Sequence, residues 1–538
     1  MATKSITIRH LFGGGWATDL GPTADVSPDS SGKVIIPFLV DAEDLLFELD
    51  GGPRKIGGTT RVNSSALESA AKVMGVYDYW RQGTGGSPAR RRVVHCGAKV
   101  LADTDDATFT TELATGLESE KVPSYSTFDD LLIYTSDSNV DVPRSWDQTT
   151  SQNLAGSPPN FAFSASHKNR LWAAGVATAP SRLYYSANTD PEDWTGSGSG
   201  SIDIDPNDGD MITGLKSHKD ELFVFKGPNK GSIHRITGSS PTGADSFARR
   251  NYVKGIGAAW HNAIFEFAGD IGFVSQYGSV HSLSATAAYG EFLEASLSRF
   301  INIGWIRTYL NYNRLRNIGT AADPLNGLVY ITASWDGSTS NNRCIVMDYR
   351  SAPQVIRWSK IPSYAAASLG VFVDTNGIRR VLAGGNDGFV RRLNVADRSI
   401  DTTTGLAYKV TTPFMNYGNP MMMKTLQAGS VGLSPKGAFD FTFGWTRDDN
   451  AQQTITLTQG GGAVLGSASS NEFTLGDGLG AGSALGGSQY VDVYHPFAET
   501  GGEFRAVQYQ ITDTTNYEDI EVHSISALVE PDATSLEN

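Results

Sequence analysis

One turn of the chain carries oxygen-bearing side chains at alternating positions, the pattern with which calcium loops surround their cation. Its candidate ligands are Asp203, Asp205 and Asn207. The position that such loops reserve for a sharply turning glycine holds Asp208, and the position of the closing glutamate holds Gly214. The sequence therefore predicts no dedicated metal centre, and the three residues are its one weak candidate.

No complete catalytic set is visible along the 538 residues. The segment 52–59 has the outer spacing of a phosphate-binding loop, but Gly58 stands where the lysine belongs, so we interpret the segment as a turn. The nine histidines are scattered singly, outside any HExxH or GxSxG motif. The adjacent acids 105–106 and 129–130 do not establish the facing carboxylates, about 5–9.5 Å apart, that glycoside hydrolysis needs. We expect that the chain has no catalytic residue, binds no cofactor and is not an enzyme.

Two unusual runs are candidates for contacts with other proteins. Arg90, Arg91 and Arg92 form the one dense basic run, which suits an acidic partner subunit or DNA phosphates, or else a solvated loop before a strand. Met421–Met423 offers adaptable side chains that suit an irregular interface or the filling of a domain junction, which we favour.

The net charge of −14 excludes a protein that holds nucleic acid by general attraction to phosphates. Residues 401–538 hold five Lys and Arg against sixteen Asp and Glu, a net −11, and the first 400 residues carry −3. This shift in composition predicts a domain boundary near residue 400. Cys96 and Cys344 lie outside any metal motif, so we expect neither a disulfide framework nor a structural zinc site. We also expect no membrane span and no export signal.

Short apolar runs, each followed by Gly, Asn or Asp turn signals, recur through the first 400 residues. Seven landmarks begin 38 to 57 residues apart, close to the length of one four-stranded propeller blade. Tight turns then lead into partner strands, as in 225–236 and 385–393. We predict an all-β protein with a β-propeller of about seven blades over 61–400, in preference to hairpins arranged in sandwiches. The landmarks are Val93–Val94, Leu131–Tyr134, Leu171–Trp172, Leu222–Phe225, Ile271–Val274, Leu328–Ile331 and Val381–Leu382.

Three further segments complete the predicted domain plan. Apolar residues at helical spacing predict a helical insertion near 291–306. After 400, clean alternation as in Phe439–Trp445 predicts an antiparallel, acidic β-sandwich over 401–538. Within it, 459–488 is dominated by Gly, Ala and Ser and is expected to be a long loop. Residues 1–60 are expected to form an N-terminal strap that leads into the propeller.

The chain resembles the tail nozzle or tail hub proteins of short-tailed bacteriophages, the packaged-DNA stabilisation type. The resemblance covers most of the chain and is carried by several segments: Phe12–Pro22, Leu49–Ile56, Asp210–Leu215, Asp220–Phe225, Gly231–Ile233, Gly255–Gly257, Ile271–Val274, Val280–Leu283, the expected helix at 291–306, Phe504–Ile511 and Glu521–Ile525. The Gly-rich stretch at 459–488 departs from what such proteins would be expected to contain.

The resemblance implies a structural virion protein of the tail. Such a protein would form a ring, with six copies expected, below the portal and adaptor, contact tail fibres or spikes, and let genomic DNA pass without reading its sequence. An acidic channel wall would repel the phosphates, although the acidity could serve solubility alone. The alternatives are a propeller glycosidase or glycan-binding protein acting on a cell-surface polysaccharide, and a monomeric propeller scaffold.

Overall fold

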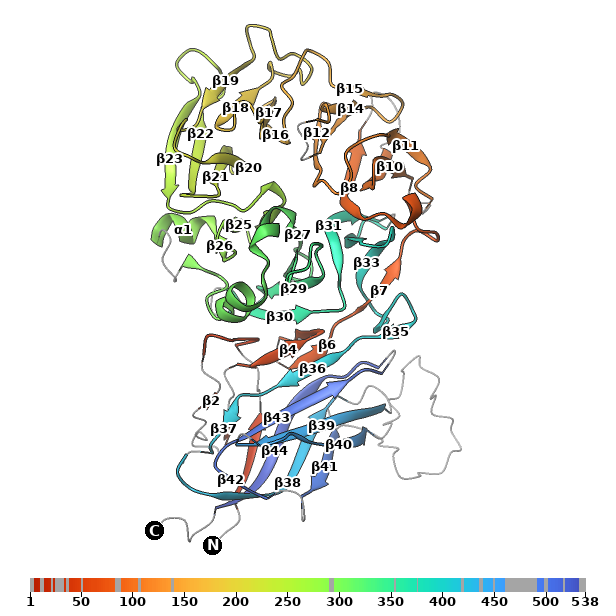
Figure 1. Ribbon diagram of the computed structural model, residues 1–538, viewed down its shortest axis with the longest axis vertical. Coiled ribbons are helices and arrows are strands. Elements are labelled where there is room, and N and C mark those ends of the chain that lie inside the picture. Colours follow the sequence, from red (N-terminus) through yellow and green to blue (C-terminus); the bar gives the residue numbers. More distant parts are fainter. Residues whose placement is uncertain are drawn as a thin grey trace. The chain divides into compact units, whose positions relative to one another are not determined.

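The chain is almost entirely β-structure in a computed structural model (Figure 1). It divides into two compact units: unit 1 comprises residues 1–60, 345–363 and 394–538, and unit 2 comprises 61–344 and 364–393. The structure describes residues 4–9, 14–20, 23–24, 33–34, 38–49, 52–82, 89–104, 108–136, 140–289, 295–352, 355–374, 376–417, 420–434, 439–448, 450–459, 491–497, 502–515 and 518–531. The Gly-rich stretch 460–488 lies outside them. No helix in these ranges is long and apolar enough to cross a membrane.

Unit 2 consists of seven β-meanders that follow one another along the chain, which confirms the predicted propeller. By meander, the strands are β8 (Val73–Arg81), β9 (Ala89–Cys96), β10 (Lys99–Asp103), β11 (Thr111–Ala114); β12 (Ser124–Phe128), β13 (Leu131–Thr135), β14 (Arg144–Trp146), β15 (Ser151–Asn153); β16 (Phe163–His167), β17 (Arg170–Ala174), β18 (Arg182–Tyr185), β19 (Gly200–Asp203); β20 (Met211–His218), β21 (Glu221–Gly227), β22 (Ser232–Thr237), β23 (Ala248–Lys254); β24 (Ile264–Phe267), β25 (Asp270–Val274), β26 (Val280–Ser282); β27 (Gly319–Asp323), β28 (Leu328–Ala333) and the start of β29 (Arg343–Asp348); β31 (Ala366–Val373), β32 (Arg379–Gly385), β33 (Val390–Val395).

The first strand of each meander lies on the inside of a ring (Figure 1). β8 contacts β12, β12 contacts β16, and β16 contacts β20. The 3-10 turn η2 (His261–Ala263), which leads into β24, contacts β20; β24 then contacts β27, β27 contacts β31, and β31 returns to β8. The seven inner strands therefore form a closed circle, in which the faces of each sheet pack on two neighbours and only short outer edges remain.

Hydrogen bonds close the circle of strands at the point where the chain enters unit 2. The Val62 N–H donates to the Val390 carbonyl over 2.7 Å. The buried Asn63 accepts from the Val390 N–H over 2.7 Å and donates to the Gly388 carbonyl over 3.0 Å. Residues at the start of this unit are thereby tied to its last meander, 325 and 327 positions later in the sequence.

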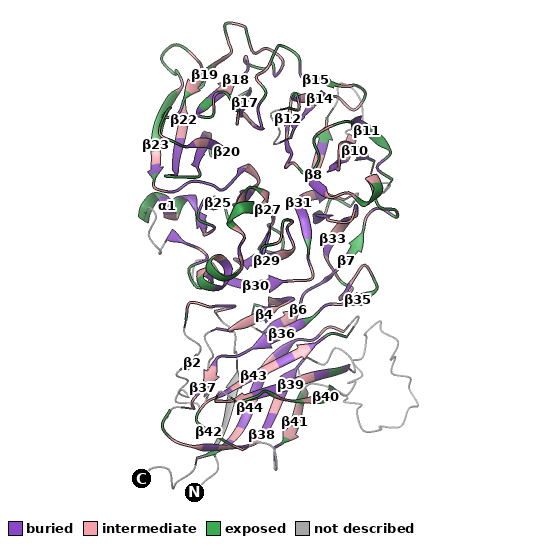
Figure 2. Ribbon diagram, viewed as in Figure 1, coloured by how far each residue is buried: buried purple, intermediate pink, exposed green. Residues whose placement is uncertain are grey.

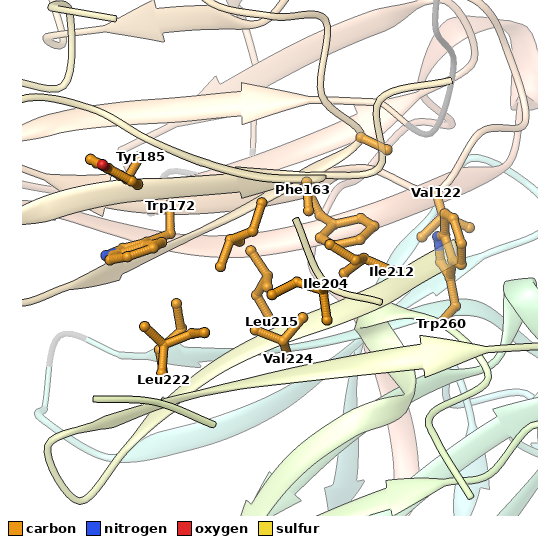
Figure 3. Packing of buried hydrophobic residues seen from close by; sticks show 14 of the residues in the cluster. Val122, Phe163, Trp172, Tyr185, Ile204, Ile212, Leu215, Leu222, Val224 and Trp260 are labelled. Atoms are coloured by element: carbon orange, nitrogen blue, oxygen red, sulfur yellow. The ribbon is translucent and has the colours of Figure 1, made fainter. Parts of the chain in front are cut away.

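All seven sequence landmarks fall on the second strand of a meander: β9, β13, β17, β21, β25, β28 and β32. These strands are buried along most of their length, and β17 and β28 are buried at every residue (Figure 2). The reason is that a second strand has a neighbour on each side within its sheet and another blade against each face. Figure 3 shows one such interblade core, where Trp172, Leu222 and Val224 pack together with Phe163 and Trp260.

Within the described residues the fifth meander has three strands, and its helical segments differ from the predicted insertion at 291–306, of which 291–294 lies outside the described residues. The helix α1 spans Leu283–Tyr289 and a π-helix spans Ile303–Tyr309. Between them, Ser296 bridges His281, and the Leu297 N–H donates to the Val280 carbonyl over 2.8 Å. The segment around Ser296 thus pairs with the open edge of β26 instead of continuing a helix. The remaining 3-10 turns are Glu68–Ala70 and Tyr312–Asn317.

Unit 1 is a sandwich of two sheets. The first has the strand order β3–β1–β44–β38–β41, with β42 also on β38, and the second contains β2, β37, β43, β36, β4 and β30, with β39 pairing β43 and β40. Phe497, directly after β41, packs against Phe443 and Trp445 of β39, which joins the two sheets through an aromatic core. The bounds are β1 (Lys4–Arg9), β2 (Thr23–Ala24), β3 (Lys33–Val34), β4 (Asp41–Glu43), β5 (Leu45–Phe47), β6 (Pro53–Lys55), β7 (Gly58–Arg61), β30 (Arg357–Ile361), β34 (Ser399–Ile400), β35 (Thr404–Gly405), β36 (Tyr408–Thr411), β37 (Phe414–Met415), β38 (Lys424–Leu433), β39 (Phe439–Arg447), β40 (Gln453–Gln459), β41 (Val491–Pro496), β42 (Glu503–Phe504), β43 (Val507–Asp513) and β44 (Val522–Pro531).

The sandwich departs from the expected plan in two respects. It is not built from the C-terminal segment alone, because β1 pairs with β44 along its whole length and β4 lies between β30 and β36. It is also not purely antiparallel, because β1–β3, β2–β37 and β4–β30 are parallel pairs. Strands from three separate stretches of chain therefore share its sheets.

The predicted turn at 52–59 is wrong, because its residues form parts of strands β6 and β7. Lys55 is fully buried and donates to Asp513 Oδ2 over 2.8 Å. A Cβ at Gly58 would lie 2.0 Å from the Ser399 carbonyl oxygen. The glycine therefore permits a close backbone approach, and the likeness to a phosphate-binding loop has no structural counterpart.

Candidate functional site

The inner strands of unit 2 enclose a channel with a cavity of about 450 Å³. Its lining is rich in hydroxyl groups and rings, drawn from β8, β12, β16, β20 and β24. Tyr77 stacks on Tyr125, with ring centroids 5.1 Å apart, and Phe163 stacks on His261 at 5.2 Å. Ser126 and Ser164 share a hydrogen bond of 2.7 Å. The channel wall is therefore polar but carries little charge.

The described lining of the channel holds no carboxyl group of the kind that glycoside hydrolysis uses. Among the residues that the structure describes, no Asp or Glu lines it, and its one lysine, Lys216, pairs with Glu266 over 3.0 Å. Burial lowers the pKa of His261 to about 3, so its imidazole is neutral. Retaining and inverting glycosidases both depend on two carboxyl groups, and this channel supplies neither.

A serine and a histidine do meet beside the channel. Ser217 Oγ lies 2.8 Å from Nδ1 of His167, but burial lowers the pKa of His167 to about 4, which makes the imidazole a weak base at neutral pH. Its Nε2 has no hydrogen-bond partner among the described residues, so nothing orients the ring as in a catalytic triad. We interpret the contact as structural.

Similar Ser–His contacts recur in unit 2. Ser232 meets His234 at 3.0 Å and Ser279 meets His281 at 2.7 Å, in both cases on or beside the third strand of a meander. These two contacts at equivalent positions of neighbouring meanders indicate a structural role, whereas the His167–Ser217 contact joins the inner strands β16 and β20.

A second cavity, of about 200 Å³, opens at the loops that precede the inner strands. We call it the mouth pocket. Its lining comes from the entry to β8, the entry to β12, the 3-10 turn before β27, the β28–β29 connection, the start of β31 and the β32–β33 turn. These residues are Lys72, Met74, Glu120, Lys121, Val122, Asn313, Arg314, Arg316, Asn317, Thr339, Ser340, Asn341, Ala367 and Asn386.

The mouth pocket holds four cationic side chains against one carboxylate. Lys72 donates to Glu120 over 2.7 Å, and Lys121 pairs with Glu118 over 3.3 Å. Arg316 lies over the Trp260 ring, 4.5 Å from its centroid. Within the described ranges neither Arg314 nor Arg316 forms an ion pair with a carboxylate. The pocket therefore has an excess of positive charge that the protein does not neutralise.

Its floor is an amide network. The buried Asn341 donates to the Asn317 carbonyl over 2.6 Å and to the Ala367 carbonyl over 3.0 Å. Asn386 donates to the Asn341 carbonyl over 2.9 Å. The Oδ1 atom of Asn386 is shielded from solvent and accepts no hydrogen bond from the described residues. The site thus combines cationic donors with one unfilled acceptor.

The candidate calcium ligands do not converge on one point. Asp203 forms a two-pronged ion pair with Arg182, and Asp205 pairs with Arg249. The place of a cation in the turn is taken by the buried Lys226, whose Nζ donates to the carbonyls of Ile204 and Asp205 and to Asp208 Oδ2. Asn207 stands at a left-handed turn position, with φ of 67°. Elsewhere in the described ranges no three Cys, His, Asp or Glu side chains form a metal-binding group.

The arginine run is split between core and surface. Arg92 is buried, forms a two-pronged ion pair with Asp103 at 2.9 and 2.5 Å, and so cannot reach a partner. Arg90 pairs with Asp78 over 3.1 Å. Arg91 is half-buried and hydrogen-bonds to the Arg90 carbonyl. Only Arg90 and Arg91 therefore remain available as the predicted partner contacts.

Sequence reasoning missed the mouth pocket. Its one local signal is the polar run 311–317, which carries two arginines directly after an apolar segment. The remaining lining residues come from five other connections, and each is an ordinary loop residue when considered alone. Of the tested acid pairs, Asp129 and Asp130 form the tight turn between β12 and β13, and 105–106 lies outside the described residues.

Comparisons with known proteins assign no family. No family model and no curated protein matches the chain. Solved structures with a partial likeness include the N-terminal domain of Nup159 (TM-score 0.32, 11% identity, 66% of this chain and 98% of that one). A second is an exo-β-1,3-galactanase of Phanerochaete chrysosporium (TM-score 0.29, 8% identity, 88% of this chain and 99% of that one). A third is a family 43 arabinoxylan arabinofuranohydrolase of Bacillus subtilis (TM-score 0.23, 10% identity, 87% of this chain and 99% of that one). At these scores the likeness assigns neither substrate nor partner.

Proposed function

We propose that this chain is a structural protein of a short bacteriophage tail, a nozzle subunit that forms a ring with copies of itself and conducts packaged DNA. The supporting observation is architectural. The sequence resemblance implies a β-propeller, a terminal β-sandwich and an N-terminal strap, and the chain contains a propeller and a sandwich in which the strand β1 pairs with the C-terminal β44. No catalytic step is part of the proposal.

The DNA path would run between subunits and not through a propeller. The cavity in the propeller channel has a volume of about 450 Å³. A space of that size cannot admit a duplex whose major groove alone is about 12 Å wide. The conduit would therefore lie on the symmetry axis of a closed ring, with six copies expected.

The charge distribution suits such a conduit. Each lysine or arginine that contacts phosphate adds attraction through counterion release, which would slow DNA in transit. The last 138 residues carry −11 of the net −14. In this proposal the acidic segment faces the DNA, while the portal–adaptor assembly and the tail fibres or spikes bind other surfaces of the ring in the virion tail.

Imaging of the purified full-length chain tests the proposal. Negative-stain micrographs and mass photometry at micromolar concentration are expected to show closed rings, with a central hole wide enough for duplex DNA. A monomer at every concentration, both alone and mixed with tail particles that lack the nozzle, would contradict the proposal. A ring with a neutral or basic inner wall would contradict only the acidic lining.

A second candidate function, glycan binding, is favoured by the mouth pocket, whose amides and hydroxyls are the groups that hydrogen-bond sugars. Its glycosidase form has less support, because the described linings of both cavities hold only one carboxylate, Glu120. Incubation of the purified chain with host-type polysaccharides tests this candidate. Release of reducing ends would establish hydrolysis, and retention without cleavage would establish binding.

A further inference from the structure

The mouth pocket has the chemistry of a site for an acidic sugar, and this inference rests on the glycan-binding candidate above. We infer that the pocket binds one saccharide unit that carries a carboxylate. Three independent features of the lining support this ligand class.

The first feature is the pair of arginines on one 3-10 turn. Arg314 and Arg316 are exposed, line the same cavity, and have no carboxylate partner among the described residues. A planar guanidinium matches a carboxylate with two parallel hydrogen bonds, so arginine is well suited to this recognition. The Trp260 ring beneath Arg316 and a hydrogen bond of 3.3 Å from Arg316 Nη2 to the Met211 sulfur orient this guanidinium, and its other N–H groups form no hydrogen bond within the described residues.

The second feature is the unfilled acceptor. Asn386 Oδ1 is shielded from water yet accepts no hydrogen bond from the described residues, whereas Asn386 Nδ2 is held by the Asn341 carbonyl. A buried acceptor without a donor is costly. An ionised carboxylate has no proton to give it, but a sugar hydroxyl does. A ligand that carries hydroxyl groups as well as a carboxylate would satisfy both the arginines and this acceptor.

The third feature is size. A cavity of about 200 Å³ is smaller than the roughly 300–1,000 Å³ of pockets for drug-sized ligands. It fits a single pyranose unit and would not enclose an extended chain. Thr339 and Ser340 at its edge supply further hydroxyl contacts, and Lys72 and Lys121 add to the positive potential.

Titration calorimetry with the full-length chain tests the inference with three probes: a glucuronic acid oligosaccharide, a neutral glucose oligosaccharide of equal length, and inorganic phosphate. The acidic sugar is expected to bind about a hundredfold tighter than the neutral one, since each of the two arginines supplies one charge-assisted hydrogen bond and each such bond corresponds to about tenfold. The preference should weaken as salt rises, because the arginines are exposed.

Variants locate the interaction. Arg316→Gln and Arg314→Gln are each expected to weaken binding of the acidic sugar about tenfold and to leave the neutral sugar unchanged. Arg250→Gln, at an exposed arginine of β23 that does not line the pocket, is the matched control and should bind like the wild type. Unchanged melting temperatures would show that all three variants fold.

Each contrary outcome has its own meaning. Equal affinity for the acidic and neutral sugars would overturn the acidic specificity and leave glycan binding intact. Phosphate binding as tightly as the acidic sugar would show a simple anion site and overturn the inference. Failure of both sugars to bind would overturn the inference together with the glycan-binding candidate.

Discussion

Buried charged side chains in this protein are each matched by partners in the same unit. Lys55 pairs with Asp513, and both side chains are fully buried. Asp44, also fully buried, accepts hydrogen bonds from Ser363 Oγ, Ser363 N and Ala407 N. Such partners are needed because a buried charge without them costs several kcal/mol. Local sequence does not reveal these pairs, since Lys55 and Asp513 are 458 positions apart.

Asp44 is expected to make stability depend on pH. Burial raises its pKa from 3.8 to about 6, against the lowering effect of the hydrogen bonds from Ser363 and Ala407, and nearby Glu43 raises it further. Because the folded-state pKa is higher, this contribution to stability is fully present below pH 3.8 and is lost as pH rises through 6. We predict that the unfolding free energy of the wild type relative to Asp44→Asn falls by about 2 kcal/mol between pH 4.5 and 7.

Urea unfolding at several pH values measures this difference. Asp492→Asn, at an exposed aspartate of β41 in the same unit, should give a profile parallel to that of the wild type. If the profile of Asp44→Asn also runs parallel to that of the wild type, the Asp44 carboxyl is not the source of the pH dependence of stability.

At the scale of elements, the repeated unit was visible because of how propeller blades pack. The second strand of each meander is covered on both faces and both edges, so its sequence is a nearly continuous apolar run. Outer strands such as β19 and β23 are largely exposed and carry no such signal. The predicted helix over 291–306 differs from the structure because the edge of β26 is open, and pairing by Ser296 and Leu297 satisfies backbone groups that a local helix would leave unpaired.

The connection between β19 and β20 is expected to depend on Lys226 of β21. Its ammonium satisfies two carbonyls and the Asp208 carboxylate at 2.7 to 2.9 Å. Replacing one partner of such a pair leaves the others unsatisfied, so Lys226→Met should lower the unfolding free energy by about 3 kcal/mol. Thermal melts measure the effect, with the exposed Lys230→Met as the matched control.

The position of the Lys226 ammonium also leads to a prediction for calcium binding. With the ammonium in place, calcium should not shift the melting temperature of the wild type, and a clear upward shift would revive the site at Asp203, Asp205 and Asn207. A Lys226→Met protein as stable as Lys230→Met would contradict the structural role of the lysine.

At the scale of the whole molecule, the propeller is a ring whose closure depends on a few contacts between distant parts of the chain. Asn63 supplies an acceptor to Val390 and donors to the carbonyls of Gly388 and Ser65. A ring that opens at this seam loses the interblade core between its last and first meanders, where β31 contacts β8. Closure should therefore contribute to stability beyond the hydrogen bonds themselves.

We predict that Asn63→Ala lowers the unfolding free energy by about 1–3 kcal/mol, because it leaves the Val390 N–H without a partner and removes one of the two donors to the Gly388 carbonyl, which keeps the Leu67 N–H. Hydrogen exchange should show lost protection first in β33 and then in the blades on either side. Asn188→Ala, at an exposed asparagine, is the control. Unchanged exchange in β33 would show that the ring is held by its packing alone.

The sequence by itself determined the β class, the seven repeated units and the alternating strands of the terminal sandwich. These features are local, since burial of a strand is written in consecutive residues. Only the tertiary structure decided that β1 joins β44, that Asn63 fastens the ring, that Arg92 lies in the core, and that residues from six connections meet in the mouth pocket. Each of these depends on contacts across tens or hundreds of positions, where the periodicity of a short stretch carries no information about its partner.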